Sequence, residues 1–179
     1  MNIRIAKLED AKDLVNIYKY YVKNTAITFE YDVPSIEEFT ERIKNTLSKY
    51  PYLVAEKNNK IYGYAYASAF KTRPAYNWAV ETSIYVNHEV SRNGVGTLLY
   101  KKLEEYLKLQ NIINVNACIA YPNEKSEEFH KKFGYKKVGH FTKCGYKLGK
   151  WHDMIWMEKF IGAHEIPPQN IIPFSELNK

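Results

Sequence analysis

A glycine-containing segment between a strand pattern and a helix pattern carries the strongest chemical signal in the sequence. Residues 86–97 read Val-Asn-His-Glu-Val-Ser-Arg-Asn-Gly-Val-Gly-Thr. Gly94 and Gly96 let the backbone approach a ligand closely because they lack a Cβ atom. The free N–H groups and positive dipole end of the helix that follows suit a pyrophosphate, and Arg92 adds a full charge. A plain strand-to-helix turn is the alternative, because a single Gly-x-Gly is neither a Walker A motif nor Gly-x-Gly-x-x-Gly.

Two titratable side chains stand out near this segment. Glu81 lies in an otherwise apolar strand pattern, where burial raises the pKa of a carboxyl group toward the range of a general base. A salt-bridged or edge-exposed glutamate is the alternative. His130 lies in a helix pattern and can donate a proton near neutral pH, although a lone helical histidine is otherwise usually exposed. The histidines and the two cysteines show no metal-ligand spacing, so we predict that no metal is bound.

Hydrophobic periodicity predicts the elements that position these residues. Apolar positions three and four residues apart indicate helices after Asp10, after the cap Ser35, after Gly94 and after the cap Asn123. Alternating or uniformly apolar runs predict strands at 2–6, 52–56, 61–70, 80–86, 113–120, 135–141 and 146–158. This order, with a strand–helix–strand crossover over 80–120, predicts a mixed α/β sheet with helices on its faces.

The strand predicted at 61–70 alternates large and small side chains. One face is expected to hold Tyr62, Tyr64 and Tyr66, and the other Ile61, Gly63, Ala65 and Ala67. Small side chains allow close packing, so we expect a helix to lie on the second face.

Length and composition exclude several classes of protein. The chain has 179 residues, 45% of them hydrophobic and 26% charged, which is typical of one globular domain rather than a disordered chain. We assign residues 1–160 to this domain and the proline-containing residues 161–179 to a C-terminal tail. No apolar run approaches the roughly 20 residues that cross a bilayer, and no signal-peptide pattern follows Met1. We therefore expect a cytoplasmic protein with no membrane partner.

The net charge of +6 is concentrated in one part of the chain. Residues 125–150 hold eight lysines against two glutamates, which leaves the rest about neutral. A positive patch attracts nucleic acid, an acidic partner or a phosphorylated cofactor, and it is also common on a solvated face. No nucleic-acid-binding motif accompanies it, so we predict no nucleic-acid partner.

Residues 91–97, taken with the strand before them and the helix after them, resemble motif A of the GNAT superfamily of acyl-CoA N-acyltransferases. The family pattern is Gln/Arg-x-x-Gly-x-Gly/Ala, and this sequence departs from it at Ser91 but has the basic Arg92 next. Other segments resemble the phosphinothricin N-acetyltransferase subfamily: Thr28-Phe29-Glu30, Arg73-x-Ala-Tyr76-x-x-x-Val-Glu81-x-Ser-Ile-Tyr-Val, Pro-Asn123-x-x-Ser126-x-x-x-His130 and Gly145-Tyr-Lys-x-Gly-x-Trp-x-Asp153. The match spans residues 2–160.

The resemblance implies a GNAT-like fold, a twisted mixed sheet of about seven strands flanked by about four helices, that binds acetyl-CoA. It implies coenzyme contacts from the backbone of Ile84, Tyr85 and Val86 and from Arg92, Asn93, Gly94, Val95, Gly96, Thr97, Asn123 and Ser126. It makes Glu81 the base for the acceptor amine and His130 the donor to the departing thiolate. Acceptor binding falls to Phe29, Glu30, Lys71, Arg73 and Tyr76, among which Arg73 can hold a carboxylate through two hydrogen bonds.

The leading hypothesis is therefore an N-acetyltransferase that moves an acetyl group from acetyl-CoA to the α-amine of a small amino acid or analogue. The resemblance implies phosphinothricin, methionine sulfoximine and methionine sulfone as acceptors, direct attack in a ternary complex, and a homodimer. Acetylation of a protein N-terminus, a polyamine or an antibiotic is one alternative, and a non-catalytic acyl-CoA-binding domain is another. A basic nucleic-acid binder is the third, and salt-dependent DNA binding without coenzyme affinity would distinguish it.

Overall fold

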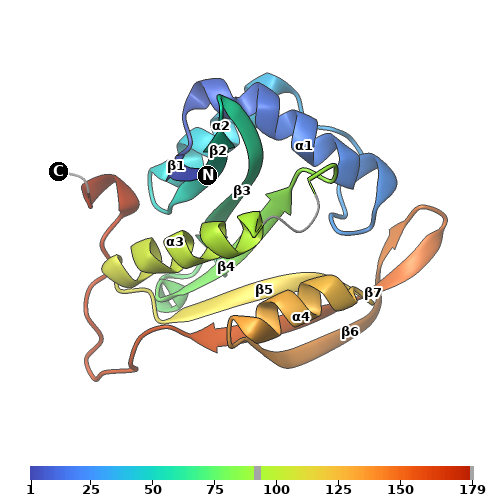
Figure 1. Ribbon diagram of the computed structural model, residues 1–179. Coiled ribbons are helices and arrows are strands. Elements are labelled where there is room, and N and C mark those ends of the chain that lie inside the picture. Colours follow the sequence, from blue (N-terminus) through green and yellow to red (C-terminus); the bar gives the residue numbers. More distant parts are fainter. Residues whose placement is uncertain (91–93, 178–179) are drawn as a thin grey trace.

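The computed structural model, which describes residues 1–90 and 94–177, contains one mixed sheet with helices on both faces (Figure 1). Its strands are β1 (Asn2–Ile5), β2 (Tyr52–Lys57), β3 (Lys60–Ala69), β4 (Ala79–Val86), β5 (Asn114–Tyr121), β6 (Lys136–Lys147) and β7 (Lys150–Phe160). Its α-helices are α1 (Ala11–Asn24), α2 (Ile36–Leu47), α3 (Val95–Leu109) and α4 (Glu124–Lys132). The seven strands lie in the order β1-β2-β3-β4-β5-β7-β6, which confirms the predicted fold class.

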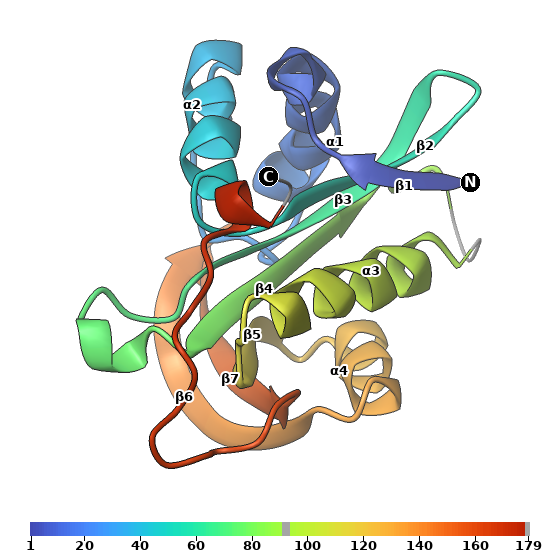
Figure 2. The same ribbon diagram turned by 90° about the vertical axis from the view of Figure 1, so that its left-hand side faces the viewer.

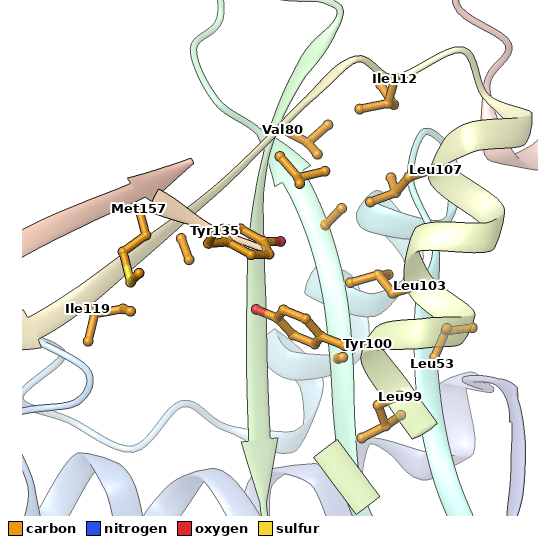
Figure 3. Packing of buried hydrophobic residues seen from close by; sticks show 14 of the residues in the cluster. Leu53, Val80, Leu99, Tyr100, Leu103, Leu107, Ile112, Ile119, Tyr135 and Met157 are labelled. Carbon is orange, nitrogen blue, oxygen red and sulfur yellow. The ribbon is translucent and has the colours of Figure 1, made fainter. Parts of the chain in front are cut away.

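The sheet separates two hydrophobic cores, one on each of its faces. On one face the leucines of α3 pack against small and branched side chains of the central strands, as Figure 3 shows for Leu99, Leu103, Leu107 and Val80. On the other face α1 and α2 cover β2 and β3 (Figure 2). The predicted helix over the small residues of β3 is therefore α3.

A β-bulge in β3 changes the face of two side chains. One residue of β2 pairs with Gly63 and the next pairs with Ile61, so Tyr62 is an extra residue in β3. The bulge inverts the alternation of side chains. Ile61 consequently packs with Tyr64 under α1 and α2, whereas Tyr62 packs on the α3 side. The prediction is wrong for Ile61 and Tyr62 and holds for the residues after Gly63.

Strands β4 and β5 are parallel neighbours only over a short distance. Their pairing covers Ala79–Glu81 and Asn114–Asn116, whereas β4 stays paired with β3 along its whole length. At the end of the short ladder the Thr82 hydroxyl donates to the Asn116 carbonyl (3.1 Å), and the Asn116 side chain donates to the Val80 carbonyl (3.2 Å). Both acceptors are backbone carbonyls that a longer β4–β5 ladder would use. Beyond this point β4 and β5 diverge (Figure 1).

The last two strands form a long hairpin in which β7 lies between β5 and β6. Leu148 and Gly149 make its turn, both with positive φ (51° and 79°), as a two-residue hairpin turn of the primed type requires. The sequence pattern predicts that residues 142–145 separate the last two strands. Those residues instead form a bulge inside β6, where Lys143 has a φ of 49°. A bulge interrupts the alternation of side chains, which explains the broken sequence pattern.

The tail folds back along the end of α3 (Figure 2). The Gln110 side chain donates to the carbonyls of Lys49 and Ile172 (2.7 and 2.8 Å). Phe174 is buried against the ring of Tyr106. Residues 161–177 thus connect the C-terminal end of α3 to the segment that precedes β2.

Candidate active site

The divergence of β4 and β5 creates a cleft bordered by strand edges. The cleft is lined by Thr82–Tyr85 of β4 and Ala117–Ala120 of β5, together with Tyr100 of α3 and His130 of α4. Two residues at the start of α4, Asn123 and Ser126, complete its wall. An extended ligand chain can therefore lie beside β4 where a neighbouring strand would otherwise be.

The backbone of β4 presents its polar groups to this cleft at alternate residues. The Ala79 carbonyl and the Asn87 N–H both bond to β3, so the odd-numbered residues of β4 face β3. The backbone of Ile84 consequently faces the cleft, whereas that of Tyr85 faces β3. The Val86 carbonyl accepts a hydrogen bond from the Tyr21 hydroxyl. Of the three backbone contacts that sequence analysis expected, the geometry favours Ile84.

The N-terminus of α3 lies beside the end of β4. Gly94 is the N-cap with a φ of 70°, and as a glycine it has no side chain of its own to cap the helix. A Cβ at Gly94 would meet nothing within 4 Å, whereas a Cβ at Gly96 would come within 3.3 Å of the side chains of Ile84 and Phe129. A side chain at Gly94 would thus meet no described atom, whereas the absence of one at Gly96 allows close packing against β4 and α4. The predicted residues Arg92 and Asn93, with Ser91, lie outside the described residues.

Glu81 lies on the opposite face of β4 from the α3 core. Its neighbours across the sheet are Ser68 of β3 and Asn116 of β5, at the point where β4 and β5 begin to diverge. Burial raises the pKa of the Glu81 carboxyl, and the positive charge of Lys71 partly opposes that rise. A half-buried carboxylate with a raised pKa, next to the opening of a cleft, can accept a proton near neutral pH.

His130 is buried, with 3% of its surface exposed, which excludes the alternative of an exposed helical histidine. Its Nδ1 lies 2.7 Å from the Ser126 carbonyl and its Nε2 lies 2.9 Å from the Tyr100 hydroxyl. Burial lowers the pKa of His130, which favours the neutral ring. Asn123 caps α4 as predicted, because its side-chain oxygen accepts a hydrogen bond from the Ser126 N–H (3.2 Å).

The connection between β3 and β4 carries three of the predicted acceptor-binding residues. The Lys71 ammonium lies 5.1 Å from the centre of the Phe70 ring, and that ring packs edge-on against Tyr76 and Trp156. Arg73 is exposed and precedes the short 3-10 helix η2 (Pro74–Tyr76). This connection therefore brings Lys71 close enough for its charge to act on Glu81, with an aromatic cluster next to Lys71.

The loop between α1 and α2 carries the other two predicted acceptor-binding residues, Phe29 and Glu30. This loop packs against the β6–β7 hairpin. Lys147 is 3% exposed and its ammonium donates to the Thr28 carbonyl (2.6 Å). The ring of Phe29 covers Gly145 so closely that a Cβ there would lie 2.3 Å from it. Glu30 binds Arg42 of α2 through both oxygens (2.8 and 3.2 Å), so its carboxylate is already paired.

The structure does not bring these two groups of acceptor residues together. Glu81 is level with Asn116, which pairs with Glu158 of β7, whereas Gly145 pairs with His152. Six residues along β7 separate the two levels, roughly 20 Å at about 3.3 Å per residue. Figure 1 shows the β3–β4 connection and the hairpin tip at opposite ends of the sheet.

The sequence pattern gives no sign of the partners that bind His130, Glu30 and Thr28. Tyr100, Arg42 and Lys147 contact His130, Glu30 and Thr28, but 119 residues separate Lys147 from Thr28 in the chain. Local periodicity carries no signal for such pairs.

Two features are absent from the described residues. Residues 1–90 and 94–177 contain no cluster of three or more His, Cys, Asp or Glu side chains placed to hold a metal ion. Within the same ranges, no helix combines the length and the apolar character needed to span a bilayer.

Sequence and fold comparisons agree along nearly the whole chain. The acetyltransferase (GNAT) domain family matches residues 3–156. A phosphinothricin N-acetyltransferase from Streptomyces viridochromogenes is 32% identical over 178 residues, covering 99% of this chain and 96% of that protein. An L-methionine sulfoximine/L-methionine sulfone acetyltransferase from Salmonella typhimurium is 26% identical over 168 residues, covering 93% and 98% of the two chains. The crystal structure of a GNAT superfamily phosphinothricin acetyltransferase from Sinorhizobium meliloti in complex with acetyl-CoA matches with a TM-score of 0.89 at 29% identity, covering 98% of this chain and 97% of that one.

Proposed function

The chain belongs to the GNAT family of acetyltransferases, and on that premise we propose that it acetylates the α-amine of a small amino acid or analogue with acetyl-CoA. The position of Glu81 carries this proposal, because a half-buried base lies where the β4–β5 cleft opens onto the other face of the sheet. The similar proteins support the acceptor class, since they are named for phosphinothricin, methionine sulfoximine and methionine sulfone.

The cleft fits the acyl donor. The pantetheine arm of coenzyme A is an extended chain with amide groups, and the free backbone edge at Ile84 offers it a donor and an acceptor. The first turn of α3, from Gly94 through Val95, Gly96 and Thr97, offers N–H groups and a positive dipole end to the pyrophosphate. Asn123 and Ser126 would add side-chain hydrogen bonds from the start of α4.

Acetyl transfer then needs three proton movements. The acceptor arrives as an ammonium ion, and Glu81 takes one proton, directly or through a water molecule, so that the nitrogen gains a lone pair. The nitrogen attacks the thioester carbonyl carbon, a C–N bond forms, and the C–S bond breaks. His130, when protonated, gives its proton to the departing thiolate, and a lowered pKa makes it a stronger acid. The amide nitrogen loses its second proton, so the reaction releases one proton overall.

The acceptor is bound at the β3–β4 connection in this proposal. Arg73 holds the acceptor carboxylate, Lys71 adds a second positive charge, and Tyr76 forms part of the aromatic wall. Phe29 and the Glu30–Arg42 pair shape the far end of the same face, at the level of the hairpin.

Three further features complete the proposal. Residues 1–160 form the catalytic domain, and residues 161–179 are a tail that stabilises it through Gln110 and Phe174. The enzyme is cytoplasmic, which its two free cysteines support. It is a homodimer, because the edge strand β6 and its neighbour β7 expose large apolar side chains, among them Val138 (58%) and Trp151 (61%). A monomer in sedimentation experiments would overturn the last statement.

Thiol release from acetyl-CoA across a panel of acceptors tests the function. The panel holds phosphinothricin, methionine sulfone, methionine sulfoximine, a polyamine and an aminoglycoside. We expect turnover on at least one of the first three. Turnover on the polyamine or aminoglycoside alone would favour the alternative acceptors. Acetyl-CoA binding without any turnover would favour a non-catalytic acyl-CoA-binding domain.

A further inference from the structure

The α1–α2 loop reaches the β4–β5 cleft through the side chain of Ile27. This side chain lines the cleft together with residues of β4, β5, α3 and the start of α4. Ile27 is 43% exposed, whereas the other lining residues are buried or half-buried. The loop therefore adds one apolar side chain to the wall of a cleft that is otherwise built from the sheet and from α3 and α4.

Hydrogen bonds on both sides of Ile27 hold it in place. Its own N–H donates to the hydroxyl oxygen of Thr25 (3.1 Å). The next residue, Thr28, is buried, and its carbonyl accepts a hydrogen bond from the ammonium of Lys147 (2.6 Å). The Thr28 hydroxyl lies 2.7 Å from the Tyr18 hydroxyl of α1. These bonds fix the backbone around Ile27, so its side chain forms a positioned wall.

The other sides of the cleft are closed. At its base the Thr82 hydroxyl donates to the Asn116 carbonyl (3.1 Å), where β4 and β5 begin to diverge. On the side of α3 and α4, Tyr100 and His130 are buried, and the Tyr100 hydroxyl lies 2.9 Å from His130 Nε2. A chain attached to the thioester carbon can therefore extend toward the face that α1 and α2 cover, which is the side where Ile27 lies.

The space inside the cleft is small. It measures about 60 Å³, and one water molecule needs roughly 10–15 Å³ of such space. The end of the pantetheine arm takes part of this volume in the proposed function. An acetyl group adds a carbonyl and a methyl group beyond the sulfur, whereas each further methylene of a longer acyl chain would press against Ile27.

We propose that Ile27 is a specificity-determining residue for the acyl donor: its side chain limits the cleft to acetyl and similarly short acyl groups. The inference rests on the placement of the donor in the proposed function. The α1–α2 loop then selects the donor through Ile27, which is a role separate from binding the acceptor.

The test compares Ile27→Ala with Ile36→Ala in the full-length enzyme. Ile36, the first residue of α2, is equally exposed (43%) and is not among the residues that line the cleft. For each protein, kcat/KM is measured with acetyl-, propionyl- and butyryl-CoA and the acceptor that turns over best. In the wild-type enzyme we expect kcat/KM to fall about tenfold with each added methylene.

Ile27→Ala should raise kcat/KM for butyryl-CoA about tenfold or more, and change the value for acetyl-CoA by less than about threefold. Ile27→Val removes less of the side chain and should give a smaller change in the same direction. Ile36→Ala should leave the ratio between the donors unchanged. A wild-type enzyme that uses butyryl-CoA as well as acetyl-CoA, or an unchanged ratio in Ile27→Ala, would overturn the inference.

Dissociation constants provide a second measurement that needs no acceptor. Calorimetric titration with coenzyme A, acetyl-CoA and butyryl-CoA should show weaker binding of butyryl-CoA than of acetyl-CoA in the wild type and in Ile36→Ala. Ile27→Ala should lose most of that difference. If the binding constants change in this way but no acceptor turns over, the acetyltransferase activity is overturned and the inference stands. If acetyl transfer occurs and the binding constants do not separate the donors in the wild type, the inference alone is overturned.

Discussion

The β4–β5 cleft and the acceptor face are built in different ways. The cleft uses backbone groups of β4 and of the first turn of α3, which are close neighbours in the chain. The acceptor face uses side chains from the α1–α2 loop, the β3–β4 connection and the β6–β7 hairpin. Its contacts join residues more than 100 positions apart, as Lys147 and Thr28 do.

This difference predicts that the cleft tolerates sequence change better than the acceptor face does. A backbone edge offers the same hydrogen bonds whatever side chains it carries, so a departure such as Ser91 leaves the described part of the cradle intact. The acceptor face changes chemistry with every substitution. Relatives at about 30% identity can therefore share the donor while differing in the acceptor.

Glu81→Gln should have the largest effect, because Glu81 lies where the two regions meet. We expect kcat to fall by about 100- to 1000-fold, with acetyl-CoA binding unchanged. The raised pKa means that folding disfavours the charged carboxylate, so above that pKa the ionised side chain lowers the stability of the fold. The glutamine variant should therefore unfold at the same or a higher temperature. A large loss of stability would assign Glu81 a structural role instead.

Arg73→Ala should separate the two regions most clearly. Loss of a charge-assisted pair with the acceptor carboxylate should raise the KM for the acceptor by about 10- to 30-fold and leave the KM for acetyl-CoA unchanged. The amide of the same amino acid, which lacks the carboxylate, serves as the control and should be insensitive to the substitution. An unchanged KM for both acceptors would remove Arg73 from the site.

One methyl group added at two glycines provides a matched comparison. In Gly96→Ala the new Cβ lies 3.3 Å from Ile84 and Phe129, so the KM for acetyl-CoA should rise about three- to fivefold. In Gly145→Ala the new Cβ displaces the Phe29 ring, which lies roughly 20 Å along the sheet from the level of Glu81, so both Michaelis constants should stay unchanged. A raised KM for the acceptor in Gly145→Ala would extend the acceptor site to the end of the face that holds Phe29.

Lys71→Gln should produce the smallest effect, a shift of the pH profile with at most a slight rise in the KM for the acceptor. The Lys71 charge holds the pKa of Glu81 below the value that burial alone would give. Its removal should raise that pKa, and because the base works deprotonated, the acid limb of the kcat profile should move to higher pH. Lys71→Arg keeps the charge and should leave the limb in place. A shift to lower pH in Lys71→Gln would contradict the assignment.

Local sequence signals predicted the helices and strands, and the positions of the candidate residues at the β4–β5 cleft and the start of α3. The caps Ser35 and Asn123, the glycine-rich start of α3 and the strand position of Glu81 all depend on neighbouring residues, and periodicity shows them. The bulges at Tyr62 and within β6 escaped prediction because an inserted residue reverses the alternation on which the pattern depends.

The remaining differences come from tertiary contacts. Burial of His130 requires Tyr100 and Tyr135 to close over it, and neither is a neighbour of His130 in a helical pattern. The separation of Phe29 from Arg73 arises because the two residues lie at opposite ends of the strands: Arg73 is in the β3–β4 connection, whereas Phe29 covers Gly145 near the β6–β7 turn. No spacing along the chain encodes the contact between Phe29 and Gly145.

The position of β7 also sets the order in which the molecule can be completed during translation. A growing chain emerges from its N-terminus, so β5 is synthesised well before residues 150–160. Until β7 arrives, β5 has only three residue pairs with β4 to hold it in the sheet. One wall of the cleft therefore stays unsupported on the ribosome until nearly the whole catalytic domain has been made. A nascent chain that stalls before residue 150 presents a β5 paired at only three residues to chaperones and proteases rather than a partly active enzyme.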